Sequence, residues 1–266
     1  MADWLQHFMM RAVDHLFAIV PQTRPSQRQL NMCKIISHRG EHNTQIKENT
    51  CDAFDRILAE GIWGLECDIR WTRDLVPMIH HDVSTDRVFG QPIVIPDTSF
   101  EELRTRIPEI PTLEELIQRY GKRLHLMIEV KTEIYPEPDQ QKQILRNLLQ
   151  NLSAGDDYHF ISLNPDMFSY VDFVPKSAML PVSEINFSSL SEITLNRNLG
   201  GLTGHFVLLQ RRLQRRHEAA GQKIGVGFPT SKNALFSVLK RDIEWVFTND
   251  ALKLKKIRSQ FLKSSV

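Results

Sequence analysis

The feature that most constrains this chain is the alternation of short apolar segments with helical patterns. Apolar segments that read as strands cover residues 34–38, 63–69, 125–131, 158–163, 178–182, 203–208, 223–228 and 244–248. Helical patterns cover residues 50–60, 112–120, 139–151, 165–172, 210–220 and 231–240. Strands that alternate with helices form parallel sheets, so eight repeats predict an α/β fold, a (β/α)8 TIM barrel.

Two segments do not fit the repeat. Residues 76–81 also read as a strand, but they follow residues 63–69 too closely for a parallel crossover. We expect them to form an extended segment or hairpin at the C-terminal end of that strand, the end where barrel enzymes hold their sites. Residues 83–111 are rich in proline, and we expect an irregular loop over the same face.

Residues 1–33 are expected to form an N-terminal extension, and residues 34–266 the barrel. Apolar residues recur at helical spacing over residues 4–20, which favours an amphipathic helix that closes one end of the domain. An interfacial membrane helix is the alternative. Residues 21–32 are expected to form a tether. Asp3, Arg11 and Asp14 interrupt any signal-peptide core, so we expect no signal peptide.

Composition narrows the function classes. The formal net charge is +1, which gives no field that would attract nucleic acid. The three cysteines form no CxxC pair, which fits a reducing compartment better than a disulfide framework. No apolar run approaches the roughly 18 residues that span a bilayer. We therefore expect a cytoplasmic protein with no nucleic-acid partner, and the oligomeric state stays open.

Acidic residues mark the ends of two expected strands. Glu66 and Asp68 are two residues apart and so point to one face, where they repel each other unless a cation lies between them. Glu129 and Lys131 repeat this spacing. Three carboxylates favour one hard divalent cation, Mg²⁺ or Ca²⁺, with Mn²⁺ as an alternative. Because Arg39 and Lys131 add two positive charges, the loaded site would suit an anionic group such as phosphate.

Two histidines complete the candidate chemistry. His38 ends the first expected strand, and His81 follows the extended segment. Their unperturbed pKa lies near 6.5, which suits an acid–base pair. Asn49 and Thr50 are helix N-cap candidates, which needs no further function. Glu48 has no capping role, and it is a candidate to orient His38 or Arg39.

Six motifs in order resemble the glycerophosphodiester phosphodiesterase family of the phospholipase C-like TIM barrels. They are His38-Arg39-Gly40, Glu48-Asn49-Thr50, Glu66-x-Asp68, Thr72-Arg73-Asp74, Pro77-x-x-x-His81-Asp82 and Glu129-x-Lys131. The resemblance runs from Lys34 to Lys131 and continues weakly to residues 248–250. It implies a TIM barrel that hydrolyses glycerophosphodiesters to glycerol 3-phosphate and an alcohol.

The resemblance also implies a role for each site residue. Glu66, Asp68 and Glu129 would hold the metal ion. His38 and His81 would be the general base and general acid, in an order that the sequence leaves open. Arg39 and Lys131 would bind the phosphate.

The chain departs from the family pattern twice. Lys47 stands where the family usually has proline, which would add positive charge near the site. Phe228 stands where the family usually has tryptophan, as a candidate apolar wall of the alcohol pocket.

Two rival functions remain. One is a lysophospholipase D or sphingomyelinase D-like enzyme that acts on lysolipids with peripheral membrane contact. Basic residues in the segment 211–216 and in the C-terminal helix fit it, although the solvated face of a barrel helix is the favoured explanation for them. The other rival is a catalytically silent barrel that binds phosphate ligands.

Overall fold

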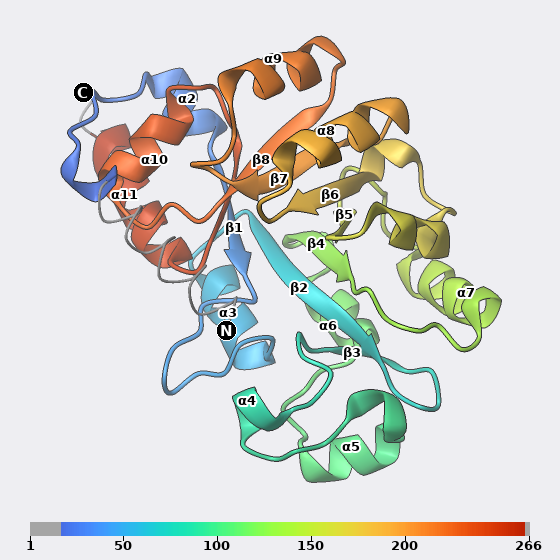
Figure 1. The fold of residues 1–266 in the computed structure, drawn as a ribbon. Helices are drawn as coiled ribbons and strands as arrows, with labels where there is room; N and C mark the ends of the chain where they lie inside the picture. The colour runs from blue at the N-terminus through green and yellow to red at the C-terminus, as the bar shows by residue number, and fades with distance from the viewer. Residues whose placement is uncertain (1–16, 264–266) are drawn as a thin grey trace.

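The computed structural model describes residues 17–263, which form a closed barrel of parallel strands with helices around it (Figure 1). Pairing of β1 with both β2 and β9 closes the sheet. The barrel strands are β1 (Lys34–His38), β2 (Gly64–Trp71), β4 (His125–Val130), β5 (Tyr158–Ser162), β6 (Met179–Ser183), β7 (Gly201–His205), β8 (Lys223–Gly227) and β9 (Trp245–Thr248). The predicted TIM barrel is therefore confirmed.

Helices follow the strands and cover the outside of the barrel. They are α3 (Cys51–Ala59), α6 (Leu113–Tyr120), α7 (Pro138–Leu149), α8 (Phe187–Asn196), α9 (Arg211–Ala219), α10 (Lys232–Leu239) and α11 (Ala251–Lys263), with the 3-10 helices η2 (Pro165–Val171) and η3 (Lys176–Ala178). Their apolar stripes and the outward faces of the strands form the main core. None of the helices within residues 17–263 is long and apolar enough to cross a membrane.

The barrel lumen is filled by side chains from alternate strand positions. A second apolar cluster lies there, made of Ile36, Met127, Ile161, Leu180, Trp245 and Phe247. Because strand residues alternate between two faces, the residues of the main core and of the lumen interleave along each strand. This packing fills the middle of the lumen with apolar side chains.

Residues 76–81 form the predicted hairpin. Strand β3 (Pro77–Ile79) pairs antiparallel with the end of β2, with Ile69 opposite Ile79. The hairpin brings the chain back toward the barrel mouth, since the His80 amide donates to the Asp68 carbonyl at 3.0 Å. His81 is thereby delivered to the same end of the barrel as Glu66 and Asp68.

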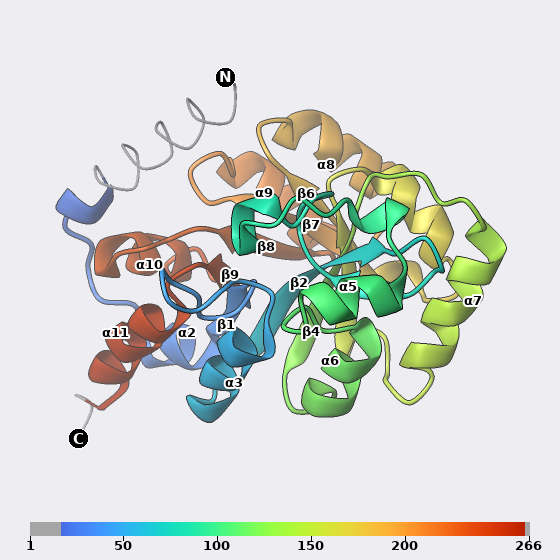
Figure 2. The ribbon, with the colours of Figure 1, turned by 90° about the horizontal axis from the view of Figure 1, so that it is seen from below.

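The prediction of an irregular loop over residues 83–111 is wrong in part. This insert contains α4 (Asp86–Phe89), the 3-10 helix η1 (Ile95–Asp97) and α5 (Phe100–Arg106). Its apolar residues form a separate small core with Met78 of β3, consisting of Ile93, Ile95, Leu103, Ile107 and Ile110. Figure 2 shows α4 and α5 lying in front of the barrel strands. The prolines hid short helices because they interrupt the helical pattern between them.

Only part of the predicted N-terminal extension is described, because residues 1–16 lie outside the described range. Phe17 packs edge-on against Phe206, which follows β7 at the mouth, with 5.1 Å between ring centroids. The expected tether contains helix α2 (Gln27–Met32), whose Ser26 cap forms a capping box with Gln29. Since α2 leads directly into β1, residues 17–33 run from the mouth of the barrel to its opposite end.

One strand is displaced from its predicted position. The sequence indicates a strand over residues 203–208, whereas β7 spans Gly201–His205. Glycine at 201 allows close strand packing, because a Cβ there would lie 2.0 Å from the Lys223 carbonyl oxygen. The shift makes His205 the last residue of the strand.

Candidate active site

Three buried carboxylates meet at the C-terminal end of the barrel. Glu66 and Asp68 lie on β2, and Glu129 stands opposite Asp68 on the neighbouring strand β4. Each carboxylate offers one oxygen, and these oxygens lie within 4.8 Å of one another. The structure therefore brings together the three metal-ligand candidates that the sequence singles out.

Two buried cations share this cluster. Lys131 Nζ lies 2.5 Å from Asp68 Oδ1 and 2.8 Å from Glu129 Oε1. Arg39 Nε lies 3.3 Å from Asp68 Oδ2, and the Arg39 amide donates to Glu66 Oε2 at 3.2 Å. The two phosphate-binding candidates thus lie against the acids, where they would face an anion bound there.

The pKa directions show that the cluster lacks positive charge. Burial and the neighbouring Asp68 charge raise the pKa of Glu66 well above its usual range. Burial also raises the pKa of Glu129. At Asp68, the charges of Lys131 and Arg39 outweigh burial and lower the pKa. A divalent cation would remove the cost of ionising Glu66 and Glu129, and an all-oxygen donor set fits a hard ion.

His38 has a defined proton arrangement. Its Nδ1 lies 2.7 Å from the amide oxygen of Asn249, which can only accept, so Nδ1 carries the proton. The unprotonated Nε2 then lies on the side of the acidic cluster, 3.7 Å from Glu66 Oε2. Burial, together with the charge of Arg39, lowers the pKa of His38 to about 3. His38 is therefore a neutral imidazole with an available lone pair.

His81 is held by a carboxylate. Its Nδ1 lies 2.7 Å from Asp82 Oδ1, and the guanidinium of Arg70 donates to the His81 carbonyl at 2.9 and 3.0 Å. Burial lowers the pKa of His81 despite the nearby Asp68 charge. These bonds fix the backbone and ring and leave Nε2 for proton transfer.

Arg87 connects two parts of the site. It donates to Glu48 at 2.6 and 3.2 Å and to Asp82 at 2.6 Å. Glu48 also accepts from Arg39 at 2.9 Å. Burial opposes ionisation of Glu48, but the Arg87 hydrogen bonds and the Arg39 charge lower its pKa to about 2. The structure places Glu48 beside Arg39, one of the two residues that the sequence analysis links to it. The sequence gives no signal for Arg87, which belongs to the insert.

The capping interpretation of Asn49 needs correction. Thr50 alone caps α3, with its side chain accepting from the Ala53 amide. The Asn49 side chain instead donates from Nδ2 to Asp68 Oδ2 at 2.8 Å, and its backbone adopts a left-handed conformation with φ 55°. Asparagine tolerates this conformation better than most residues. Asn49 therefore orients a carboxylate of the acidic cluster.

The two departures from the family pattern have different positions. The Phe228 ring packs edge-on against His38, with centroids 5.1 Å apart, so it lies beside the candidate site. Lys47 instead pairs with Glu109 at 3.3 Å and lies over the Phe89 ring at 4.4 Å. Both Glu109 and Phe89 belong to the insert, so the charge of Lys47 contacts the insert.

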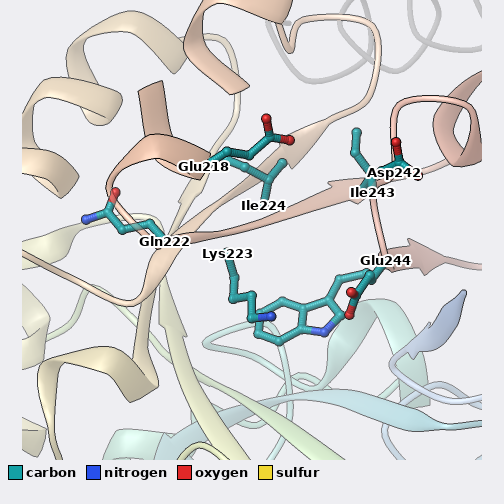
Figure 3. A pocket seen from close by; sticks show the side chains of 9 residues that line it. Glu218, Gln222, Lys223, Ile224, Asp242, Ile243 and Glu244 are labelled. Atoms are coloured by element: carbon teal, nitrogen blue, oxygen red, sulfur yellow. The ribbon is translucent and has the colours of Figure 1, made fainter. Parts of the chain in front are cut away.

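The opposite end of the barrel has a different character. His125 Nε2 lies 2.8 Å from His159 Nδ1, and Trp63 stacks on His125 with centroids 4.4 Å apart. A hollow of about 270 Å³ opens nearby, where β8 and β9 begin (Figure 3). Its lining includes Lys223 and Trp245, the first residues of those strands. This hollow is remote from the acidic cluster and is no part of the candidate site.

Comparison with known proteins supports the family resemblance that the sequence motifs indicate. Residues 38–196 match the model of the glycerophosphoryl diester phosphodiesterase family. A glycerophosphodiester phosphodiesterase of Bacillus altitudinis is 31% identical over 126 residues, which are 42% of this chain and 51% of that protein. A putative glycerophosphodiester phosphodiesterase of Bacillus subtilis is 26% identical over 194 residues, 63% of this chain and 79% of that protein. The chain thus spans about half the length of the first of these relatives.

Solved structures agree on the fold. An Oleispira antarctica phosphodiesterase, in complex with the product sn-glycerol-3-phosphate, superposes with a TM-score of 0.74 and 20% identity, over 85% of this chain and 96% of that chain. A glycerophosphodiester phosphodiesterase from Thermotoga maritima gives a TM-score of 0.71 and 19% identity, over 85% and 98% of the two chains. The family match covers more than half of the residues and includes the acidic cluster. The chain belongs to the glycerophosphoryl diester phosphodiesterase family.

Proposed function

We propose that this protein hydrolyses glycerophosphodiesters to glycerol 3-phosphate and an alcohol. The observation that carries the proposal is the buried group of Glu66, Asp68 and Glu129 at the mouth of a barrel of this family. The two basic side chains beside it, Arg39 and Lys131, supply the positive charge that a phosphodiester anion needs.

The three carboxylates would hold one divalent cation, Mg²⁺ or Ca²⁺, with Mn²⁺ as a further candidate. A bound cation at this place supplies Lewis-acid polarisation of a phosphoryl oxygen. Asn49 supports the set, because its amide holds Asp68. Arg39 and Lys131 would turn part of their hydrogen bonding from the carboxylates to the phosphate oxygens.

The two histidines would divide the proton transfers. His38, neutral and with its lone pair on Nε2, is suited to accept a proton from the attacking hydroxyl, which belongs to water or to the glyceryl group, while the phosphorus–oxygen bond to the alcohol breaks. His81, once it is protonated on both ring nitrogens and its Nδ1–H is held by Asp82, would deliver the Nε2 proton to the leaving alcohol. The Asp82 carboxylate stabilises the protonated ring of His81 in this role.

The test is hydrolysis of glycerophosphoethanolamine and glycerophosphocholine, read by release of glycerol 3-phosphate. Activity should appear with Mg²⁺, Ca²⁺ or Mn²⁺ and disappear with EDTA. His81→Ala should lower kcat by about 10²- to 10⁴-fold, whereas the control His159→Gln at the far end of the barrel should retain wild-type turnover. Full activity in EDTA, or in His81→Ala, would refute the mechanism. Binding of glycerol 3-phosphate without any turnover would indicate a silent binding barrel instead.

A second candidate function is hydrolysis of lysophospholipids at a lipid surface. Large exposed apolar side chains follow four successive barrel strands at the catalytic end: Ile134, Leu163, Ile185 and Leu208, with Ile134 89% and Ile185 75% exposed. Apolar side chains gathered on one face are typical of interaction surfaces. The basic helix α9 favours this candidate less, since Arg216 pairs with Glu192 and Leu213 packs into the core.

Activity on lysophosphatidylcholine distinguishes this candidate function from hydrolysis of water-soluble glycerophosphodiesters. Choline release from micellar lysophosphatidylcholine at a higher kcat/KM than from glycerophosphocholine would support it. Paired substitution of Ile134 and Ile185 by serine should then lower activity on micelles and leave activity on the water-soluble diester unchanged. Wild-type activity of this variant on micelles would rule out a lipid-contact role for these loops.

A further inference from the structure

The mouth of the barrel has two unlike halves. The charged side chains of the candidate site come from β1, β2 and β4. Across the mouth, apolar residues follow β5 to β8, among them Leu163 after β5 and Phe228 after β8. His205, the last residue of β7, is a buried polar side chain in this apolar half.

The strand geometry sets the direction of the His205 side chain. A Cβ on Gly204 would lie 2.6 Å from the Phe187 ring of α8, so position 204 faces the outer helices. A Cβ on Gly225 would lie 2.9 Å from both Thr203 and Phe247, and Phe247 belongs to the lumen cluster. Thr203 therefore faces the lumen, and so does His205 two residues later, at the catalytic end.

The hydrogen bonding of His205 is incomplete. Its Nδ1 accepts from the Val207 amide at 3.4 Å, which places the ring proton on Nε2. His205 Nε2 is buried and has no hydrogen-bond partner among residues 17–263. An unpaired buried donor destabilises the fold unless a ligand accepts from it. Burial lowers the pKa of His205, so the ring is a neutral donor at neutral pH.

Aromatic rings connect His205 to the catalytic side. Phe206 stacks on His205 with centroids 5.0 Å apart. The Phe228 ring lies 6.4 Å from His205 and 5.1 Å from His38. The donor and the general-base candidate therefore flank one apolar ring.

We propose that His205 is a substrate-binding residue, whose Nε2–H donates a hydrogen bond to a hydroxyl of the glyceryl group while Phe228 packs against its carbon atoms. The inference rests on the proposed function. A neutral donor in an apolar wall matches an uncharged oxygen, whereas the phosphate is drawn to the cationic half. The glyceryl group is the part of every glycerophosphodiester that carries free hydroxyls. A site that hydrogen-bonds a substrate hydroxyl discriminates strongly against analogues without it.

The test compares two substrates in the Mg²⁺-loaded protein. Glycerophosphoethanolamine carries glyceryl hydroxyls, and bis(p-nitrophenyl) phosphate carries none. We expect His205→Leu to lower kcat/KM for the first about 10- to 100-fold, mainly through KM, and to leave the second unchanged. His205→Gln should recover part of the loss, because its amide can donate. His159→Gln, a buried lumen histidine at the other end, should leave both substrates at wild-type values.

Two outcomes overturn the inference: unchanged kinetics on glycerophosphoethanolamine in His205→Leu, or equal losses on both substrates. Calorimetric binding of glycerol 3-phosphate separates this failure from failure of the proposed function. If the wild-type protein turns over no glycerophosphodiester, the proposed function fails, and His205→Leu should still bind glycerol 3-phosphate at least tenfold more weakly. Equal dissociation constants in the two proteins would then overturn the inference as well. A melting curve of each variant checks that it is folded.

Discussion

The two ends of the barrel bury titratable side chains in opposite ways. At the end where the strands begin, His125 and His159 bond each other, and His125 also bonds the Asp156 carbonyl. At the end where the strands finish, Glu66 and Glu129 are buried close to Asp68 with raised pKa values. The first arrangement uses its polar atoms internally, whereas the second needs a cation to balance it.

This difference separates a structural histidine pair from a functional site. Burial alone marks both ends equally, and both contain histidines. What distinguishes the mouth is excess negative charge, a lone pair on His38 and an unpaired donor on His205. Perturbed groups with unused bonding capacity are typical of functional sites. The predictions below test this contrast.

The largest effect is expected at the mouth, from Glu66→Gln. Hydrolysis of glycerophosphoethanolamine with Mg²⁺ should fall at least about 100-fold, because a charged ligand of the cation is lost. The free energy of unfolding in EDTA should rise, because the ionised Glu66 is costly without a cation. The exposed acid Glu192 on α8 provides the control Glu192→Gln, which should change neither quantity. Loss of stability in EDTA for Glu66→Gln would contradict the proposed charge imbalance.

The opposite pattern is expected at the other end, from His159→Ala. Its loss leaves His125 Nε2 without its partner and opens a small cavity, so unfolding should become easier by about 1–3 kcal/mol. Urea denaturation measures this change, and kcat/KM should stay at the wild-type value. A drop in kcat/KM without a change in stability would show that the pair at this end takes part in function.

A smaller effect is expected at the edge of the mouth, from Arg87→Gln. This side chain is 51% exposed but joins Glu48 and Asp82, which hold Arg39 and His81 in turn. Activity should fall about tenfold, as is typical for residues that orient others. Arg216→Gln on α9 removes a similar exposed arginine, paired only with Glu192 among the described residues, and should have no effect. Equal activities of the two variants would place Arg87 outside the site.

The smallest expected effect is on how steeply the free energy of unfolding depends on pH. Burial lowers the pKa of His125 to about 4 and that of His159, next to His125, to about 3. The unfolded chain, with pKa values near 6.5, then binds more protons than the folded chain over this interval. Their contribution to stability is therefore complete above pH of about 6.5 and is lost as pH falls. Each group contributes at most about 1.4 kcal/mol per pH unit to the pH dependence of the unfolding free energy.

His159→Gln measures this contribution. Urea denaturation at several pH values between about 5 and 7 should give a shallower dependence of the unfolding free energy for the variant than for the wild type. The mouth histidines are unchanged in this variant, so they cancel from the comparison. Identical slopes would show that His159 takes up protons equally in the folded and unfolded chains.

The sequence predicted the fold because strand and helix periodicities differ and are regular here. All eight barrel strands have counterparts in the structure, and β7 begins two residues earlier than predicted, at Gly201. The helices of the insert were missed because they are short and lie between prolines. Their small core depends on β3, a contact that no local pattern indicates.

The sequence also indicated the charged half of the site. The spacing of Glu66 and Asp68 fixes one face of one strand, and parallel strands must bring Glu129 and Lys131 to the same end. Only the tertiary structure identifies the hydrogen-bond partners of the site residues. Asn249 of the last βα turn bonds His38, and Arg87 of the insert bonds Asp82, across 211 and 5 sequence positions respectively.

The sequence by itself determined the barrel, the acidic cluster and the two histidines, because these depend on strand alternation and on the common direction of parallel strands. Tertiary structure alone decided which nitrogen of each histidine is free, why Asn49 contacts Asp68, and that His205 faces the lumen with an unpaired donor. These features depend on the register of strands that are distant in sequence and on the packing of loops between them. No local pattern of residues encodes that packing, so only the folded barrel shows it.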